Sequence, residues 1–324
     1  MCVTSVGVAR LSSFALMCAC SRRAGQYLFM FQFLQRKETP PKFAPDPEEF
    51  SLQQLVADST TPISIKAVTT LPEAARQRLA RILLPPELLR QFEIRPMNWK
   101  GPDGDGHVCV VAEPDAGLLR VEARHAAGAR DPFLSLELQD NRLNGIDLNL
   151  LVLSDPLSQR FAIDVDEQGQ PTQFGTLRRN LQAEEQAMEA GLAPGQVRTG
   201  LQASQRVLQQ VDTFLAMITH YAYFLEPLTY ASAWVFERRG FAYVRGHKLM
   251  DDIQREFQPG GELHRALDDS TPFRRPQQWR TVRGRAWAIH DGILDYIDAT
   301  WNGVRMVKQV GQHAGVDTFP DAHY

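Results

Sequence analysis

The sequence of 324 residues is short of most features that identify a protein class directly. Its four cysteines are too few for a dense disulfide framework, and no apolar run approaches the ~18 residues that a membrane-spanning helix needs. It has no excess of positive charge either, because 35 Lys and Arg stand against 38 Asp and Glu for a net charge of −3. This balance argues against a protein held to nucleic acid by bulk charge.

The common catalytic signatures are missing too. There is no Gly-x-Ser-x-Gly elbow, no Walker-type phosphate loop and no His-Glu-x-x-His helix. Cys109 lies within a strand pattern, where we expect it in the core and not as a nucleophile. No spacing typical of metal ligands occurs, so we predict no metal. A metal-dependent enzyme stays open as an alternative if the fold gathers the histidines of the C-terminal quarter, which are His247, His264, His290, His313 and His323.

What the sequence does contain is typical of a globular protein. Hydrophobic residues make up 44% of the chain and charged residues 23%, which argues against wholesale disorder. The length alone predicts about two domains. With few cysteines and no expected membrane span, we expect a cytoplasmic protein.

The N-terminal segment differs from the rest. Residues 1–37 contain three of the four cysteines and no acidic residue, and their basic residues are Arg10, Arg22, Arg23, Arg36 and Lys37. A short apolar run at 11–20 raises the possibility of a signal peptide, but Ser-Arg-Arg and a second apolar patch follow it. We interpret residues 1–37 as an unstructured basic tail, or as upstream sequence with Met30 as the alternative start. Residues 38–50 are rich in proline and charge, which predicts a linker.

The hydrophobic period then changes twice along the chain. Thr70 and Glu73 have the spacing of a capping box, and a helix is predicted from there to the Pro85-Pro86 pair, with a second short helix over 88–92. A period of two follows, which predicts strands. The five segments are 107–113, 119–123, 134–138, 146–153 and 161–165.

After Gly175 the period returns to that of a helix. Helices are predicted over 177–190, 201–222 and 230–239, with strands at 221–225 and 241–244. The short connections between the earlier strands favour an antiparallel meander. We therefore predict an α+β fold, a mostly antiparallel sheet flanked by helices, over 51–249. Residues 250–324 are predicted to form a loop-rich extension that packs on this core.

Residues 221–244 point to a known family. They predict a strand, a helix and a second strand, and the helix ends in Phe236-Glu237-Arg238-Arg239-Gly240-Phe241. This unit resembles the end of the GCN5-related N-acetyltransferase fold, in which the helix carries an aromatic-Glu-x-x-Gly-Phe ending. The predicted order of helices and strands before it is similar to that fold as well.

The resemblance implies an acyl-CoA-dependent N-acyltransferase. In that fold two neighbouring strands separate and the pantetheine arm pairs with their backbones, while the pyrophosphate lies at the N-terminus of the long helix. The implied co-substrate is acetyl-CoA or another acyl-CoA, and the acceptor is a small-molecule amine or a peptide. The nearest match to the pyrophosphate loop supplies the candidate cofactor-binding residues, which are Gln196, Arg198, Thr199 and Gly200.

Three residues are candidates for the chemistry. Glu226, at the end of the predicted strand, is the first candidate for the base that deprotonates the acceptor, and His220 is the second. Phe236 stands where the family often has a tyrosine acid, so Tyr230 on the same helix is the candidate acid. The missing tyrosine also keeps a second interpretation open, namely a non-catalytic ligand-binding or interaction protein on the same scaffold.

A basic stretch near the C-terminus has no place in this interpretation. Residues 270–285 contain no acidic residue, with Trp279 among the arginines and Trp287 just beyond, and the arginines are Arg274, Arg275, Arg280, Arg283 and Arg285. One interpretation is an anion-binding surface, because a planar guanidinium can donate two hydrogen bonds to a phosphate group. The other is an extension that packs by its tryptophans, with the arginines paired to nearby acidic residues, Asp251, Asp252, Asp268 and Asp269.

Overall fold

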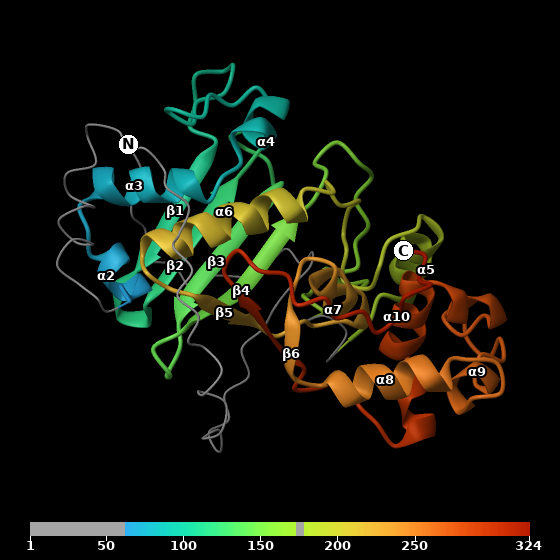
Figure 1. Cartoon of the computed structure of the whole chain (residues 1–324). Coiled ribbons are helices and arrows are strands. Elements are labelled where there is room, and N and C mark those ends of the chain that lie inside the picture. Colours follow the sequence, from blue (N-terminus) through green and yellow to red (C-terminus); the bar gives the residue numbers. More distant parts are fainter. Residues whose placement is uncertain (1–61, 173–177) are drawn as a thin grey trace.

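A single mixed sheet organises the chain. The computed structural model describes residues 62–172 and 178–324, so the predicted tail and linker lie outside the described residues. The strand order is β1-β2-β3-β4-β5-β7-β6 (Figure 1). The strands are β1 Val108–Glu113, β2 Leu118–Ala123, β3 Leu134–Asp140, β4 Ile146–Leu153, β5 Ala222–Leu225, β6 Ala242–Arg245 and β7 Arg305–Gln309.

Strands β1 to β4 form an antiparallel meander, as the short connections predicted. Gly117 has a φ of +57° after the short 3₁₀ helix η2 (Pro114–Ala116), and Asn144 has a φ of +57° in the turn before β4. Such left-handed residues allow the tight reversals that bring consecutive strands side by side. Along β2, Leu119, Val121 and Ala123 are fully buried, so one face of the meander is apolar.

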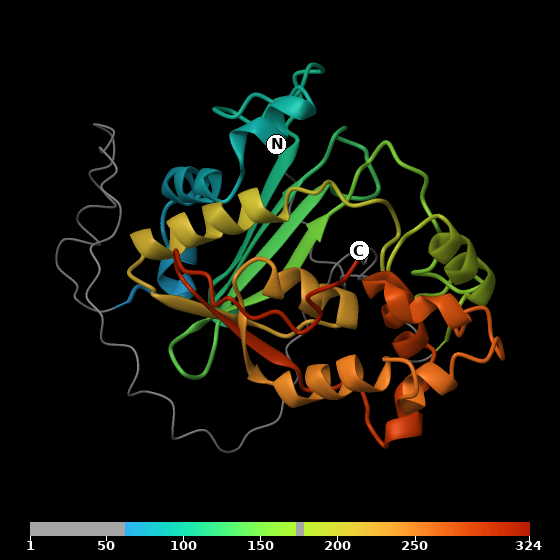
Figure 2. The same ribbon diagram turned by 45° about the vertical axis from the view of Figure 1, so that its right-hand side comes forward.

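Three helices cover that apolar face. They are α2 (Ile65–Thr69), α3 (Glu73–Ile82) and α6 (Ser204–Met217), and both views show them on the same side of the sheet, with α4 (Pro86–Gln91) near one end (Figures 1 and 2). The carboxylate of Asp140, at the end of β3, accepts the amides of Ile65 at 2.7 Å and Lys66 at 2.8 Å. This contact ties the start of α2 to the sheet and satisfies amides that the helix itself leaves unbonded.

The second half of the sheet follows a different path. Strand β5 runs parallel to β4, and α7 (Tyr230–Glu237) connects β5 to β6. Strand β7, which comes last in the chain, lies between β5 and β6 and is antiparallel to both. The stop at Gly240 was predicted, and its φ of +91° explains why glycine ends the helix there.

Two long connections pack on each other beside the sheet. The one between β4 and α6 contains α5 (Leu181–Glu189), and the one between β6 and β7 contains α8 (His247–Glu256), α9 (Glu262–Arg265), η4 (Pro276–Arg280), α10 (Val282–His290) and η5 (Ile293–Ile297). Phe161 and Ile163 from the first meet Phe273 and Trp287 from the second in a small hydrophobic cluster of their own. The region is one packed unit built from segments far apart in sequence (Figure 2).

Four local predictions were wrong. Residues 161–165 form no strand, because Asp164 and Asp166 are turned into ion pairs with Arg160 and Arg178. The helix α3 begins after Pro72, and Thr70 instead ends α2, so the predicted capping box does not form. Cys109 lies in β1 as predicted, but this is an edge strand and the residue is exposed.

The fourth concerns residues 250–324, predicted to be loop-rich. They include α8, most of which lies there, together with α10 and a strand of the sheet itself. The helix α8 has a strongly one-sided apolar pattern, with Met250 and Ile253 buried. Within 62–172 and 178–324, no helix has the length and apolar character that crossing a bilayer demands.

Candidate functional site

The strands β4 and β5 part after a very short parallel contact. Their pairing consists of Ile146 with Tyr223 and Asp147 with Phe224, although β4 continues to Leu153. A bulge in β4, opposite Glu137 and Leu138 of β3, lies just beyond this contact. Because a bulge bends its strand and increases the local twist, it directs β4 away from β5. We call the place where the two strands separate the fork.

The far end of β4 is paired with a different segment. The amide of Leu201 donates to the carbonyl of Leu153 at 3.3 Å, and the amide of Asp155 donates to the carbonyl of Thr199 at 2.7 Å. The loop that precedes α6 therefore returns to the end of β4 and closes one end of the fork. The start of α6 consequently lies beside the sheet edge that β5 leaves.

The N-terminus of α6 suits an anion. Its first turn contains no acidic residue, and none of the described side chains caps it at Ala203. The hydroxyl of Ser204 accepts a hydrogen bond from Nε of Arg239 at 2.9 Å, which brings a guanidinium to the same end of the helix. Unbonded amides, the helix dipole and an arginine together favour negative charge there.

Three of the predicted cofactor-binding residues make hydrogen bonds to neighbouring segments of the protein. Oε1 of Gln196 accepts the amide of Ala193 at 2.8 Å. Arg198 donates to the carbonyl of Ser158 and lies 3.4 Å from Asp131. Thr199 is exposed, and its amide donates to the hydroxyl of Ser158 at 3.2 Å. Gly200 is half-buried, and a Cβ there would lie 3.5 Å from the carbonyl of Leu153. The structure thus places Thr199 and Gly200 beside the far end of β4, whereas Gln196 and Arg198 bond to neighbouring segments of the same connection.

Glu226 also lies at the fork, on the opposite face of the sheet from α6. Tyr223 points toward α6, because its hydroxyl donates to Asp212 of that helix at 3.0 Å. Side chains alternate along a strand, so Phe224 and Glu226 point the other way. Arg305, the first residue of β7, donates to Glu226 Oε1 at 3.0 Å and to Asp147 Oδ1 at 2.8 Å. One guanidinium therefore joins both arms of the fork.

The α6 side of the same strands is closed. The carboxylate of Asp212 accepts from Lys308 at 2.7 Å and from the amide of Gly311 at 3.1 Å, in addition to Tyr223. Burial, followed by the charge of Asp212, raises the pKa of Tyr223 well above its ordinary value. Tyr223 and Lys308 are buried and Asp212 is half-buried, and their contacts join α6 to the sheet on this side.

The structure does not bring His220 to the fork. It precedes β5, whereas Glu226 follows β5, so the strand separates the two residues. The ring of His220 is buried, and its Nε2 bonds to the carbonyl of Ile63 at 2.9 Å. Burial lowers the pKa of His220, against the raising effects of that carbonyl and of Asp140. Its contact holds the segment before α2 against the end of α6.

Tyr230 lies close to Glu226 in the sequence, but its side chain is buried inside the protein. It is the first residue of α7, only 1% of it is exposed, and its hydroxyl lies 3.5 Å from Nη1 of Arg285. Burial raises the pKa of Tyr230 to about 12, although Arg285 acts in the opposite direction. A phenol so placed is a poor proton donor to a group that arrives from solvent.

The arginines of the C-terminal basic stretch bind partners within the protein. Arg274 donates to Asp291, Arg275 lies near Glu185 and Glu189, and the guanidinium of Arg283 lies 4.2 Å from the ring centre of Tyr324. These ion-pair partners are not the predicted aspartates, although the charge of Arg274 also acts on Asp268. The contacts favour the interpretation of a packed region. Trp287 supports it, since its indole donates to the carbonyl of Leu192 at 2.8 Å.

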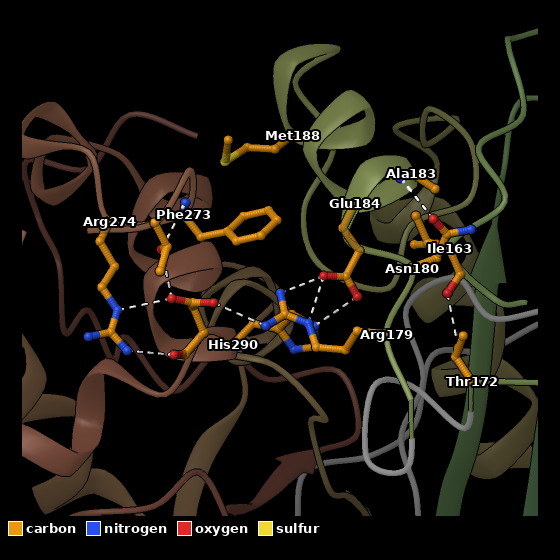
Figure 3. Close-up of polar contacts among 12 residues, drawn as sticks. Ile163, Thr172, Arg179, Asn180, Ala183, Glu184, Met188, Phe273, Arg274 and His290 are labelled. Atoms are coloured by element: carbon orange, nitrogen blue, oxygen red, sulfur yellow. Dashed lines mark hydrogen bonds and ion pairs between the residues drawn. The ribbon is translucent and has the colours of Figure 1, made fainter. Parts of the chain in front are cut away.

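A buried charged cluster lies between α5 and α10 (Figure 3). Arg179 donates to Glu184 at 2.5 Å and to Asp291 at 3.0 Å, and His290 lies 3.4 Å from Glu184. Each carboxylate faces a cation, and the cluster links the two long connections. In the described part of the chain, no group of three or more histidine, cysteine, aspartate or glutamate side chains could hold a metal ion.

Sequence reasoning missed Asp147 and Arg305. Asp147 follows the alternation of a strand and looks like any solvent-facing residue in the pattern. Arg305 is separated from Asp147 by 158 positions and from Glu226 by 79, so no local spacing joins them. Comparison of the chain with protein-family models, with curated proteins and with solved structures found no match.

Proposed function

We propose that this chain is an acyl-CoA-dependent N-acyltransferase that binds its co-substrate, acetyl-CoA or another acyl-CoA, in the fork between β4 and β5. The observation that carries the proposal is the parallel contact of only two residue pairs in the middle of a seven-stranded sheet. Strands that part in a sheet leave backbone amides and carbonyls facing the separation, and an extended ligand that carries amide groups can pair with them.

The pantetheine arm of a CoA ester is such a ligand. With its amides along β4, its pyrophosphate would reach the start of α6, where free amides and Arg239 favour an anion. Gly200 would let the backbone approach that group, because it presents no side chain.

The reaction needs an acceptor amine in its neutral form. The amine nitrogen forms a bond to the thioester carbonyl carbon, the bond from that carbon to sulfur breaks, and the electron pair leaves with the sulfur. Glu226, the carboxylate at the fork, would take the proton of the acceptor ammonium. After the attack the nitrogen loses a second proton as the amide forms, and this proton neutralises the thiolate, while the proton taken by Glu226 passes to solvent.

A second candidate function is binding without turnover. It is favoured by Tyr230, because this phenol is enclosed and bonded to Arg285, and by Phe236, which carries no proton to donate. In that case the fork would hold a CoA ester or a related ligand, and the protein would act as a binding or interaction module.

Thermal unfolding of the full chain with and without acetyl-CoA tests the proposal. At about 100 times its dissociation constant, a ligand of the folded state adds ~2.7 kcal/mol of stability. We expect this gain to be lost in Gly200→Trp and kept in Gly128→Trp, which places the same bulk on an exposed loop. If Gly200→Trp does not fold, Arg239→Met tests the same end of α6 by a rise in the dissociation constant.

Absence of any stabilisation by acetyl-CoA, or an equal loss in both tryptophan variants, would overturn the proposal. Release of free thiol in the presence of primary amines separates the two candidates. Binding accompanied by thiol release supports the transferase, whereas binding without release for a broad panel of amines supports the binding module.

A further inference from the structure

The two edges of the sheet differ in how they are protected. Strand β6 at one edge is four residues long, has a register shift against β7 between Tyr243 and Arg245, and ends in the charged Arg245. Strand β1 at the other edge is six residues long, and its pairing with β2 runs through all six without a shift (Figure 1). Edge strands are commonly kept from pairing with other chains by shortness, bulges, charged side chains or proline. The sequence of β1, Val-Cys-Val-Val-Ala-Glu, is apolar up to its last residue and contains no proline or lysine.

Three residues of β1 turn their backbone groups away from the sheet. The amide of Arg124 donates to the carbonyl of His107 at 2.9 Å, so this carbonyl faces β2 at the start of the pairing. Backbone groups alternate in direction along a strand, hence those of Val108, Val110 and Ala112 face outward. Within 62–172 and 178–324, no backbone group bonds to these outward groups. They form a template on which one more strand can pair.

A second copy of this chain fits that template. When β1 is placed antiparallel to itself about a two-fold axis at Val110, Val110 pairs with its own counterpart and Val108 pairs with Ala112. In this register each of the three outward-facing residues meets another of the three. The side chains that meet on the helix side are all apolar, and Val108 and Val110 already pack against the core there. On the other side of the sheet, Cys109 meets Val111.

The ends of the paired strands are complementary in charge. In this register the exposed Glu113 lies opposite His107 of the second copy. Arg124 is the neighbour of His107 on β2, and it bonds to Glu122 at 2.8 Å. Glu122 pairs with Cys109, which lies on the same side of β1 as Glu113, so the arginine and the acid share one side of the sheet. The two-fold axis repeats this approach at both ends of the strand pair.

We propose that β1 is the interface of a symmetric dimer, in which two copies of this chain join their sheets edge to edge by antiparallel pairing about Val110. The two β1 strands then lie at the centre of one continuous sheet. The inference is independent of the proposed function, because β2 and β3 lie between β1 and the fork. Stable interfaces bury about 1,200 Å² or more, and a pair of six-residue strands is small in comparison, so we expect a dimer that dissociates on dilution.

Analytical ultracentrifugation of the full chain at a series of concentrations tests the dimer. We expect the average mass to rise toward that of two chains between about 1 and about 100 µM. Val110→Pro removes the central outward-facing amide, and we expect it to raise the dissociation constant of the dimer at least about tenfold. The pairing with β2 does not use this amide and should be retained, which the unfolding temperature of the variant reports.

A surface variant covers the case in which Val110→Pro does not fold. Glu113→Lys reverses an exposed charge at the end of the strand, next to His107 and Arg124 of the second copy. We expect it to raise the dissociation constant at least about fivefold. Glu167→Lys makes the same change of charge on an exposed turn of another segment and is the matched control, which should leave the dissociation constant unchanged.

Disulfide formation tests the register of the two strands. In a Cys109→Ser background, Val110→Cys should give a disulfide between the two copies on mild oxidation, because the paired Cα atoms are about 5.5 Å apart in such a register. Val108→Cys in the same background should give none between its own counterparts, because position 108 faces position 112 of the second copy. Mass spectrometry of the linked peptides identifies which cysteines have joined.

Three results would overturn the proposal. The first is a chain that stays monomeric over the whole range of concentrations. The second is a dimer that neither Val110→Pro nor Glu113→Lys weakens, because such a dimer uses another surface. The third is equal disulfide formation by Val110→Cys and Val108→Cys, which excludes pairing about Val110. Binding of acetyl-CoA is measured separately, so a failure of the dimer and a failure of the proposed function are distinguishable.

Discussion

The hydroxyl of Tyr230 lies 3.5 Å from Nη1 of Arg285, a guanidinium that is completely buried. Arg285 also donates to the carbonyl of Trp279 at 2.7 Å and to Gln254 at 2.5 Å, and its planar group lies over the ring of Phe319 at 3.5 Å. Burial lowers the pKa of Arg285, although the neighbouring Tyr230 opposes this effect. Neutral oxygens and aromatic faces therefore hold this cation in the interior.

Tyr230→Phe tests the ionisation of this pair. Because burial raises the pKa of Tyr230 from 10.0 to about 12, the neutral phenol stabilises the fold fully below pH 10, and this contribution is lost as the pH rises through 12. Urea unfolding at pH 9 and at pH 12 should therefore show a steeper loss for the original chain than for Tyr230→Phe, with a difference of about 2–3 kcal/mol. Parallel stability curves would show that the phenol ionises freely in the folded state.

Glu184→Gln should make the protein less sensitive to acid. Burial opposes the ionised form of Glu184, but the hydrogen bonds from His290 and Arg179 outweigh it and lower the pKa of this carboxyl. Its contribution to stability is therefore complete above its ordinary value of 4.5 and is lost as the pH falls through the lowered value. Unfolding temperatures between pH 7 and pH 3 should fall more steeply in the original chain than in Glu184→Gln. Equal slopes would contradict this role.

Arg179→Met should destabilise the fold by about 3 kcal/mol, since it leaves Glu184 and Asp291 buried without their shared cation. Urea unfolding measures the loss, and hydrogen exchange in α5 reports whether it is local to the packed connections. Arg255→Met is the control, because its ion pair with Asp252 lies at the surface and its removal should change little. A similar result for the two variants would mean that the cluster in Figure 3 does not join α5 to α10.

Lys308→Met should be more harmful than the double change Lys308→Met with Asp212→Asn. The single change leaves the half-buried carboxylate of Asp212 without its cation, at a cost of up to about 3 kcal/mol, whereas the double change removes both charges. A double-mutant cycle by urea unfolding measures the coupling. Additive effects would show that the contact between α6 and β7 does not depend on this pair.

Gly284→Ala should destabilise the protein although Gly284 lies within a helix, where alanine is usually better by about 1 kcal/mol. A Cβ at this position would lie 2.5 Å from the carbonyl oxygen of Gln278 and 2.7 Å from its Cα, which are backbone atoms of η4. We expect a loss of about 1–3 kcal/mol from overpacking. Gly128→Ala, with open space around it, is the control, and a gain in Gly284→Ala would show that η4 can move away.

The path of the chain up to β4 could be predicted from local pattern because apolar and polar residues alternate in the sequences of β2 and β3 and the connections are short. Strand β7 could not be predicted in this way. Its buried positions are Met306 and Lys308, so a charged residue interrupts the apolar alternation, and only the contact with Asp212 explains it. The segment at 161–165 shows the reverse, since its alternation is that of a strand but its acidic residues are bound by arginines from the same connection.

Some residues of the candidate site could be named from the sequence, whereas the roles of others depend on the fold. The loop before α6 and Glu226 could be named from the resemblance of one short unit to a known fold. The roles of His220 and Tyr230 depended on what surrounds them, and both prove to be enclosed by partners, Ile63 and Arg285, that lie 157 and 55 positions away. Enclosure of this kind leaves no trace in spacing, because it results from the packing of whole elements.

The sequence by itself determined the α+β class, the four-strand meander, and the unit of β5, α7 and β6 with its stop at Gly240, since alternation, helical period and turn residues act over a few positions. Only the tertiary structure decided that β7 enters between β5 and β6, that β4 and β5 part after two residue pairs, and that Arg305 meets Asp147 and Glu226. Those contacts join strands that come together only after the long connections have folded, so the packing of those connections controls them.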